Sequence, residues 1–161
     1  MCSIYVNPTQ FNKSDDFLNY PKKIKDDIHL LEKNNCDILY LPEDVDLYKS
    51  NEIAKNYNFN GIELSLEGKY RPGHFNGMAT IVEKLLNIVK PQKVFFGEKD
   101  LQQLMIIKEL VKQNNISTKV IGCPIIREKN GLAKSSRNQH LSKTDRESCS
   151  VIYKQLLLFN N

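Results

Sequence analysis

The sequence of 161 residues has few of the features that would set it apart from an ordinary globular protein. Its 7 Gly and 6 Pro are too few for a linker or a collagen-like chain, and with 40% hydrophobic residues it is too apolar for intrinsic disorder. Purely apolar runs are short, and the N-terminus has no basic region followed by a long apolar stretch. We therefore expect no membrane-spanning segment and no signal peptide, and we expect a cytoplasmic protein.

The cysteines and histidines lack the spacing of a metal site. None of the 4 Cys belongs to a C-x-x-C pair, and no His lies at ligand spacing from any of them. A zinc site is therefore not expected, and without a secretion signal the cysteines are predicted to be reduced thiols. The sequence also has no Walker A motif, no G-x-G-x-x-G fingerprint and no Ser-His-Asp order.

The formal net charge of +4 is concentrated in the last quarter of the chain. Residues 1–122 contain 16 basic and 16 acidic residues, whereas residues 123–161 contain 7 basic and 3 acidic residues. This excess indicates an anionic partner, and a single nucleotide would be sufficient. Aromatic residues are not interleaved with the basic stretch, so a nucleic-acid surface is not expected.

Short β-prone segments alternate with amphipathic helical segments along the chain. We expect strands at residues 2–6, 37–41, 61–66, 93–96 and 118–122, and helices at residues 22–34, 43–48, 75–89, 101–113 and 144–159. This alternation predicts an α/β fold with a parallel sheet, in which ligands bind at the carboxyl ends of the strands. The texture changes after Pro124, which suggests one domain over residues 1–122 and the start of another over residues 123–161.

Two polar motifs directly follow predicted strands. The first is Asn-Pro-Thr-Gln at residues 7–10, and the second is Gly-Glu-Lys-Asp at residues 97–100. In the second motif, Gly97 allows a sharp turn, and the helix start that follows offers N–H groups to a phosphate. Lys99 adds positive charge, and Asp100 could bind a ribose hydroxyl or Mg²⁺. The alternative is an ordinary β-α turn in which Asp100 caps the helix.

Two further segments contain candidate ligand-binding side chains. Ser135 and Ser136, between Lys134 and Arg137, are suitable donors to phosphate oxygens, although a solvated basic loop is the alternative. Residues 67–75 form a Gly- and Pro-containing loop with Arg71 and His74, where a histidine is more often structural than catalytic. Uncharged amides, which could orient a hydroxyl-bearing carboxylate, are present at Gln10, Gln102 and Gln103.

The motifs at residues 7–11, 71–75, 96–104 and 135–138 occur in the order found in the pantothenate synthetase (pantoate–β-alanine ligase) family. The resemblance covers nearly the whole chain. It implies a Rossmann-like nucleotidyltransferase domain with the start of a smaller C-terminal domain, commonly in a homodimer. It also implies a ligase of pantothenate biosynthesis, in the coenzyme A pathway, which uses ATP and Mg²⁺. Such an enzyme makes a pantoyl-adenylate, releases pyrophosphate, and then lets β-alanine displace AMP.

The resemblance also implies roles for individual residues. Gln10 and Gln103 would bind pantoate, with Gln10 also near β-alanine, and Arg71 and His74 would lie beside the site. The residues that would contact ATP are Gly97, Glu98, Lys99, Asp100, Ile126, Lys134, Ser135, Ser136 and Arg137. Catalysis by positioning and charge neutralisation would rest on Lys99, Ser135, Ser136 and Arg137.

The family pattern is not complete in this sequence. The His-x-Gly-His segment of the family, with its strand, Gly-rich turn and helix, has no counterpart before Met1, and the last helix stops at Asn161. We therefore expect a fragment that is inactive on its own. The alternatives are a non-catalytic protein that keeps part of the nucleotide pocket, and a different nucleotidyltransferase of similar fold, which the two Gln motifs disfavour.

Overall fold

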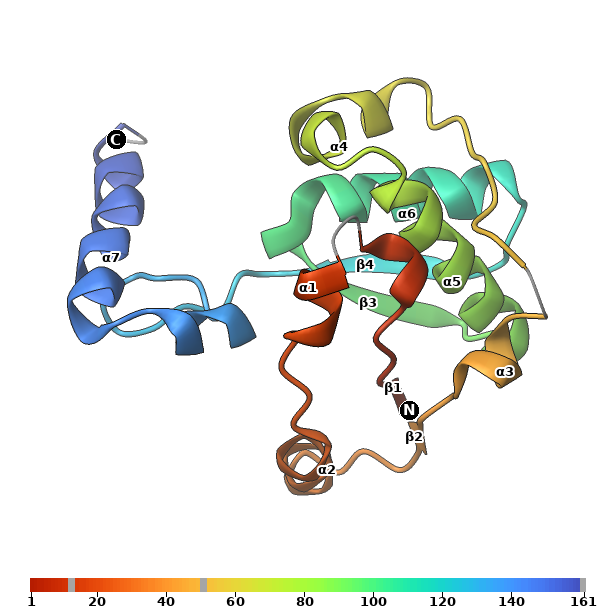
Figure 1. The fold of residues 1–161 in the computed structure, drawn as a ribbon, viewed down its shortest axis with the longest axis horizontal. Helices are drawn as coiled ribbons and strands as arrows, with labels where there is room; N and C mark the ends of the chain where they lie inside the picture. Colours follow the sequence, from red (N-terminus) through yellow and green to blue (C-terminus); the bar gives the residue numbers. More distant parts are fainter. Residues whose placement is uncertain (12–13, 50–51, 160–161) are drawn as a thin grey trace.

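A computed structural model describes residues 1–11, 14–49 and 52–159 (Figure 1). Within these residues, no helix has the length and apolar character needed to cross a membrane. The elements are β1 (Cys2–Ser3), η1 (Pro8–Gln10), α1 (Ser14–Leu18), α2 (Ile24–Lys33), β2 (Leu39–Tyr40), α3 (Asp44–Leu47), η2 (Ile62–Leu64), α4 (Leu66–Tyr70), α5 (His74–Val89), β3 (Lys93–Gly97), η3 (Glu98–Asp100), α6 (Leu101–Gln113), β4 (Lys119–Cys123), η4 (Ser136–His140) and α7 (Lys143–Leu158), where η marks a 3-10 helix.

The strands form two parallel pairs. β1 lies beside β2, and β3 lies beside β4 in register from Lys93 opposite Lys119 to Gly97 opposite Cys123. Helix α6 connects β3 to β4, as a parallel pair requires a crossover connection. The structure thus confirms the α/β class and the parallel strand direction that the alternating pattern predicted.

The core lies between α5, α6 and the β3–β4 pair. Apolar residues recur along both helices at three- and four-residue spacing, so each helix has one face to bury. The buried cluster is Phe59, Phe75, Met78, Ala79, Ile106, Ile107 and Leu110, with Phe96 of β3 and Val120 of β4 packed against it. This packing holds the start of α6 at the carboxyl end of β3, where one candidate motif lies.

The predicted strand at residues 61–66 is wrong. Residues Ile62–Leu64 form the 3-10 helix η2, and α4 begins at Leu66. Gly61 has φ 85° and Leu66 has φ 45°, and a strand cannot continue through such left-handed backbone. The Gln102 amide, on α6, donates to the carbonyls of Ile62 and Ser65 at 2.7 Å each, so a contact distant in sequence holds this turn.

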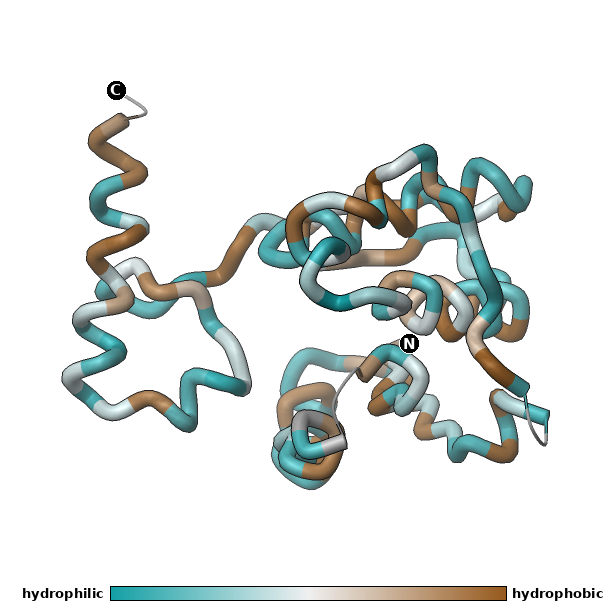
Figure 2. The backbone as a smooth tube through the Cα atoms, turned by 45° about the horizontal axis from the view of Figure 1, so that its top comes forward, coloured by the Kyte–Doolittle hydropathy of each residue, from teal (hydrophilic) through white to brown (hydrophobic). Residues whose placement is uncertain are grey.

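The C-terminal segment extends away from the β3–β4 pair (Figure 1). An antiparallel bridge joins Arg127 to Ala133, and the Arg127 guanidinium carbon lies 3.6 Å from the centre of the Tyr153 ring on α7. Gly131, at φ 98°, also packs against that ring. The hairpin and α7 therefore form one unit, whose helix carries the apolar stretches visible in Figure 2.

Candidate active site

The candidate site lies beyond the carboxyl ends of β1 and β3. The turn η1 follows the extended chain after β1, and η3 follows β3 immediately. In parallel α/β folds, these strand ends are where ligands bind. Both motifs that the sequence placed after strands are therefore at the expected end of the fold.

Asn7 attaches η1 to helix α5. Its side chain is buried, its Nδ2 donates to the Gly77 carbonyl at 3.0 Å, and its Oδ1 accepts from the Tyr48 hydroxyl at 2.8 Å and the Thr9 hydroxyl at 3.1 Å. Gly77 permits this approach, because a Cβ there would lie 2.3 Å from the Thr9 carbonyl oxygen. The position of Gln10, one residue further on, is thereby defined.

The backbone carbonyl of Gln10 is held by two side chains from the loop before α5. His74 Nδ1 lies 2.7 Å from this oxygen, and Arg71 Nη2 donates to it at 3.4 Å. The Gln10 side chain has no hydrogen bond to another described residue. The clamp therefore fixes the backbone of Gln10.

His74 is a neutral imidazole with its proton on Nδ1. Arg71 Nη1 lies 3.3 Å from His74 Nε2, and because a guanidinium only donates, Nε2 must accept. Nδ1 is then the donor to the Gln10 carbonyl. Burial lowers the pKa of His74, the bond to Gln10 and the Glu67 carboxylate oppose this shift, and the Arg71 and Arg137 charges add to it. His74 thus contacts the Gln10 backbone through its Nδ1 proton.

The lowered pKa of His74 predicts a pH-dependent stability. The unfolded chain binds a proton at the ordinary pKa of 6.5 more readily than the folded chain does, so the free energy of unfolding should fall as the pH drops below 6.5. Urea titrations between pH 5 and pH 8 measure this slope. His74→Gln should flatten it, whereas His29→Gln, at an exposed position on α2, should leave it unchanged. An equal slope in wild type and His74→Gln would contradict the assignment.

A chain of contacts connects this clamp to the start of α6. Arg71 Nη1 donates to Glu67 Oε1 at 2.6 Å, and the Glu67 amide donates to Gln102 Oε1 at 3.0 Å. The Gln102 side chain is buried, and its amide group is hydrogen-bonded to the backbone of Glu67, Ile62 and Ser65. Its neighbour Gln103 is half-buried, and the Gln103 side chain makes no hydrogen bond to another described residue. The structure thus separates two adjacent glutamines into a structural one and a candidate ligand group.

The Gly-Glu-Lys-Asp motif differs in two details from the sequence-based expectation. Gly97 has φ −71°, so the turn does not need glycine, and a Cβ there would have no neighbour closer than 4.0 Å. Asp100 occupies the N-cap position of α6, but its side chain makes no capping bond and instead accepts from Lys99 Nζ at 3.2 Å. The predicted helix cap by Asp100 is therefore wrong, although both side chains are exposed at the strand end, as in an ordinary β-α turn.

The basic segment after β4 brings its candidate residues together through a hairpin. The Lys134 amide donates to the Ile126 carbonyl at 2.9 Å, which places these two residues side by side. Ser135 caps η4 by accepting from the Arg137 amide at 3.3 Å, and Ser136 begins that turn. The guanidinium carbon of Arg137 lies 5.4 Å from the centre of the Tyr20 ring. Arg137 therefore faces the N-terminal part of the chain.

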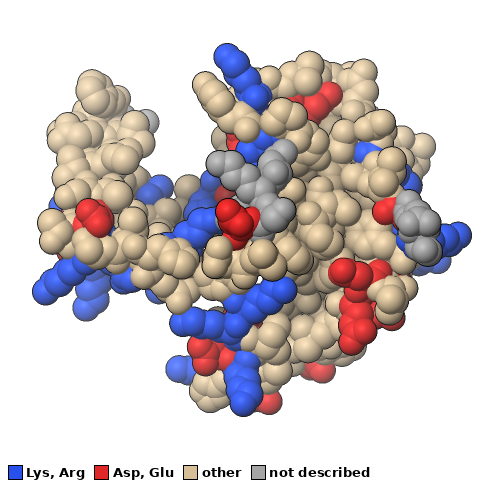
Figure 3. All heavy atoms as spheres, in the orientation of Figure 1, with Lys and Arg blue, Asp and Glu red and all other residues tan. Residues whose placement is uncertain are grey.

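Lysine and arginine side chains are visible along the C-terminal segment and in the region between it and the rest of the molecule (Figure 3). The Arg137 charge lies close enough to His74 to lower the pKa of the imidazole. Part of the positive charge of residues 123–161 therefore lies near His74, which contacts the Gln10 carbonyl. An anionic ligand in this region would meet favourable charge.

Two residues of this region, Glu67 and Tyr20, were not among the residues predicted from the sequence. Glu67 forms an ion pair with Arg71. Its position four residues before that arginine, a spacing at which helical side chains are neighbours, is the sequence signal for this pair. Tyr20 belongs to an aromatic group in which Phe11 packs edge-on against Phe17 at 5.4 Å and against Tyr20 at 5.8 Å between ring centres. The density of aromatic residues between positions 11 and 20 is the only sequence signal for it.

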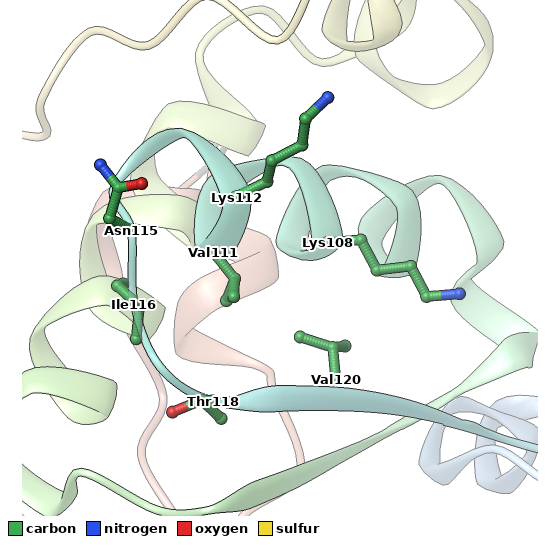
Figure 4. Close-up of a pocket in the computed structure, with 7 residues that line it drawn as sticks. All are labelled: Lys108, Val111, Lys112, Asn115, Ile116, Thr118 and Val120. Atoms are coloured by element: carbon green, nitrogen blue, oxygen red, sulfur yellow. The ribbon is translucent and has the colours of Figure 1, made fainter.

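A hollow of about 510 Å³ between α6 and β4 lies at the wrong end of the fold for this site. In Figure 4, Val111 and Val120 point into it, whereas Lys112 points away. It lies where α6 ends and β4 begins, opposite the carboxyl end of β4. Its lining combines apolar and polar residues, Lys108, Val111, Lys112, Asn115, Ile116, Thr118 and Val120, and includes none of the candidate site residues.

The fold and the strand-end site define a parallel α/β protein with a candidate site for a small anionic ligand. Comparison with known proteins identifies it more closely, because the sequence pattern of the Pantoate-beta-alanine ligase family matches residues 1–161. The chain belongs to this family.

Individual relatives agree with this assignment. The pantothenate synthetase of Flavobacterium psychrophilum is 46% identical over 155 residues, which are 96% of this chain and 55% of that protein. A solved structure of the Thermus thermophilus enzyme superposes with a TM-score of 0.90 at 38% identity, covering 96% of this chain and 56% of that one. The Francisella tularensis enzyme, solved with β-γ ATP and β-alanine, gives 0.87 at 47% identity, covering 94% and 58%. The chain thus spans about half the length of the relatives it matches.

Proposed function

We propose that this chain contributes the pantoate and nucleotide site of an ATP-dependent pantoate–β-alanine ligase. The observation that carries the proposal is the convergence of Gln10, Arg71, His74 and Arg137, from three distant parts of the sequence, beyond the strand ends. The family membership and the ATP and β-alanine bound to the Francisella relative support it. Gln10 and Gln103 would bind pantoate, and Gln10 would also lie near β-alanine.

In the proposed reaction, the pantoate carboxylate attacks the α-phosphorus of ATP. A carboxylate O–P bond forms, the bond to the β-phosphate oxygen breaks, and pyrophosphate leaves with the electron pair. The β-alanine amine then attacks the acyl carbon and displaces AMP. Neither step needs a protein nucleophile, so the chain acts by positioning and by charge. Uncharged amides at Gln10 and Gln103 suit this task, because they orient pantoate without neutralising its attacking carboxylate.

The nucleotide would lie against the two candidate phosphate segments. Lys99, Ser135, Ser136 and Arg137 would stabilise charge on the phosphates, and the contacts would be completed by Gly97, Glu98, Asp100, Ile126 and Lys134. The described residues contain no group of three or more His, Cys, Asp or Glu that could hold a metal ion. Mg²⁺ binds through few carboxylates together with phosphates and water. Asp100 could bind this ion or a ribose hydroxyl, and the ion would neutralise phosphate charge.

The proposal extends to the organisation of the protein. Residues 1–122 would form the ATP- and pantoate-binding domain, and residues 123–161 the beginning of a C-terminal domain that carries the Ser-Ser-Arg segment. The hairpin and α7, packed together through Arg127 and Tyr153, support this division. We also propose that the protein is a homodimer and that it lies in the cytoplasm. Analytical ultracentrifugation would test the dimer.

The adjacent glutamines provide a matched test of the proposed site. Gln103→Ala should weaken pantoate binding about three- to tenfold, since one net hydrogen bond is worth roughly 0.5–1.5 kcal/mol, and should leave the thermal midpoint unchanged. Gln102→Ala should lower the midpoint, because it leaves the carbonyls of Ile62 and Ser65 without their partner. Titration calorimetry with pantoate and ATP, together with thermal unfolding, measures both effects.

The results of these measurements test the role of Gln103 and distinguish a ligase from a non-catalytic protein. Equal pantoate affinity in wild type and Gln103→Ala would remove Gln103 from the site. Pantoate and ATP binding without any pantoate-dependent exchange of pyrophosphate into ATP would favour the alternative of a non-catalytic protein that retains the nucleotide pocket.

A further inference from the structure

Two of the 4 cysteines lie together at the start of the β1–β2 pair. The Cys2 amide donates to the Ile38 carbonyl at 2.9 Å, and the Cys36 thiol donates to the same oxygen at 3.3 Å. The Cys36 sulfur therefore lies beside the backbone of Cys2, although η1, α1 and α2 separate the two residues in the sequence. Neither cysteine belongs to the candidate active site.

The backbones of both cysteines are held by hydrogen bonds. Asn35 follows the end of α2 with φ 54°, and its amide donates to the Glu32 carbonyl at 3.0 Å. The Cys36 amide donates to the Leu31 carbonyl at 3.0 Å. These are the two bonds with which a helix ends when a left-handed residue follows it, so the chain leaves α2 in a defined direction. Cys2 is fixed by its place in β1, opposite Leu39 of β2.

The two thiols also interact electrostatically. Burial raises the pKa of the Cys2 thiol, and the neighbouring Cys36 raises it further, because two thiolates repel each other. Both cysteines are half-buried, so a small reagent can reach them. The other two cysteines lie in different elements, Cys123 at the end of β4 and Cys149 within α7.

We propose that Cys2 and Cys36 form a redox modification site, at which a small disulfide such as oxidised glutathione converts the two free thiols into a reversible protein disulfide. Side-chain rotation must bring the sulfurs to a bond length of about 2.05 Å, which releases the Cys36 thiol from Ile38 and the Cys2 thiol from the Ser3 carbonyl at 3.8 Å. The link would tie β1, which pairs with β2 through only two residues, to the end of α2.

The reaction proceeds by two thiol–disulfide exchanges. One protein thiolate attacks a sulfur of oxidised glutathione, a protein–glutathione S–S bond forms, and one glutathione leaves with the electron pair of the broken bond. The second protein thiolate attacks the protein sulfur of this mixed disulfide and displaces the second glutathione. The protein loses two electrons and two thiol protons, and both glutathiones take these up as thiols. The proposal does not depend on the assigned reaction.

The test uses a Cys123→Ser/Cys149→Ser variant, in which only the proposed pair remains. In a buffer of oxidised and reduced glutathione, the intact mass should fall by two hydrogen atoms, with no glutathione retained. The tryptic peptides that contain Cys2 and Cys36 should be joined until a reductant is added. The ratio of disulfide to dithiol should be at least about tenfold higher without urea than in urea, because the fold gives the sulfurs a higher effective concentration than a flexible loop does.

The disulfide should also raise the thermal midpoint by about 5–15 °C, since it constrains the unfolded chain. Cys36→Ser in the same background is the matched control, because its hydroxyl can still donate to the Ile38 carbonyl. This variant should stop at the mixed disulfide, with one glutathione on Cys2, and oxidation should not raise its midpoint as it does in the variant with both thiols.

Four results would overturn the proposal. One is a glutathione retained on each of the two cysteines, or thiols that stay unmodified, since the fold then does not bring the sulfurs together. Another is a covalent dimer in place of the internal link. The third is an equal ratio of disulfide to dithiol with and without urea. The fourth is a lower thermal midpoint after oxidation, which would show that the link is incompatible with the β1–β2 pair.

Discussion

Replacing Gly77 by alanine is expected to lower the free energy of unfolding by about 1–3 kcal/mol. Alanine normally stabilises a helix interior relative to glycine by about 1 kcal/mol, so helix propensity alone predicts the opposite sign. The structure decides between the two effects, because the new Cβ would lie 2.3 Å from the Thr9 carbonyl oxygen and 2.8 Å from the Gln10 nitrogen. Both are backbone atoms, which cannot rotate away as a side chain would.

The same substitution should displace the candidate pantoate ligand. To relieve the clash, η1 must move away from α5, which breaks the bond between Asn7 and the Gly77 carbonyl and shifts Gln10 from its clamp. Pantoate affinity should therefore fall together with stability. Urea unfolding and pantoate titration measure the two effects.

Gly97→Ala is the matched control for stability. Its φ of −71° is accessible to any residue, and a Cβ there would lie 4.0 Å from the nearest atom. Its free energy of unfolding should stay within about 0.5 kcal/mol of wild type. If Gly77→Ala were as stable as Gly97→Ala, the close approach of η1 to α5 would not be a constraint on the fold.

Arg137→Lys is expected to slow adenylate formation about a hundredfold or more in a full-length family enzyme that carries this region. The guanidinium can bind two phosphate oxygens at once, and lysine keeps the charge without this geometry. We predict that residues 134–137 close over the triphosphate when the nucleotide binds. Pantoate-dependent pyrophosphate release measures the rate.

Salt distinguishes a phosphate clamp from long-range attraction. Attraction across solvent is screened within about 8 Å at physiological ionic strength, whereas a desolvated clamp is not. The defect of Arg137→Lys should therefore persist at low and at high salt. Arg146→Lys, at an exposed position of α7 in the same basic stretch, should match wild type at both. If Arg137→Lys also forms the adenylate at the wild-type rate at low and at high salt, the phosphate clamp is contradicted and the interpretation of a solvated basic loop is retained.

Much of the candidate site could be predicted because its motifs are local. The strand–turn–helix pattern around residues 97–100 placed that motif at a strand end, and apolar spacing defined α5 and α6, with observed boundaries within one residue of those predicted. The basic excess after residue 122 indicated an anionic ligand. These features depend on periodicity and charge, which the order of residues encodes directly.

The roles of neighbouring side chains were decided only by tertiary contacts. Nothing local distinguishes Gln102 from Gln103. The Gln102 side chain is buried against η2 and α4, whereas the Gln103 side chain is not hydrogen-bonded to a described residue. Likewise, His74 contacts the Gln10 carbonyl 64 residues away, and this contact assigns its proton to Nδ1. The turn at residues 61–66 was predicted as a strand because its short apolar pattern fits either structure, and the Gln102 amide from α6 selects the turn. The sequence determined most helices and strands and the distribution of charge, because periodicity and charge are local, whereas packing between distant segments decided the turn at residues 61–66 and which polar side chains are paired.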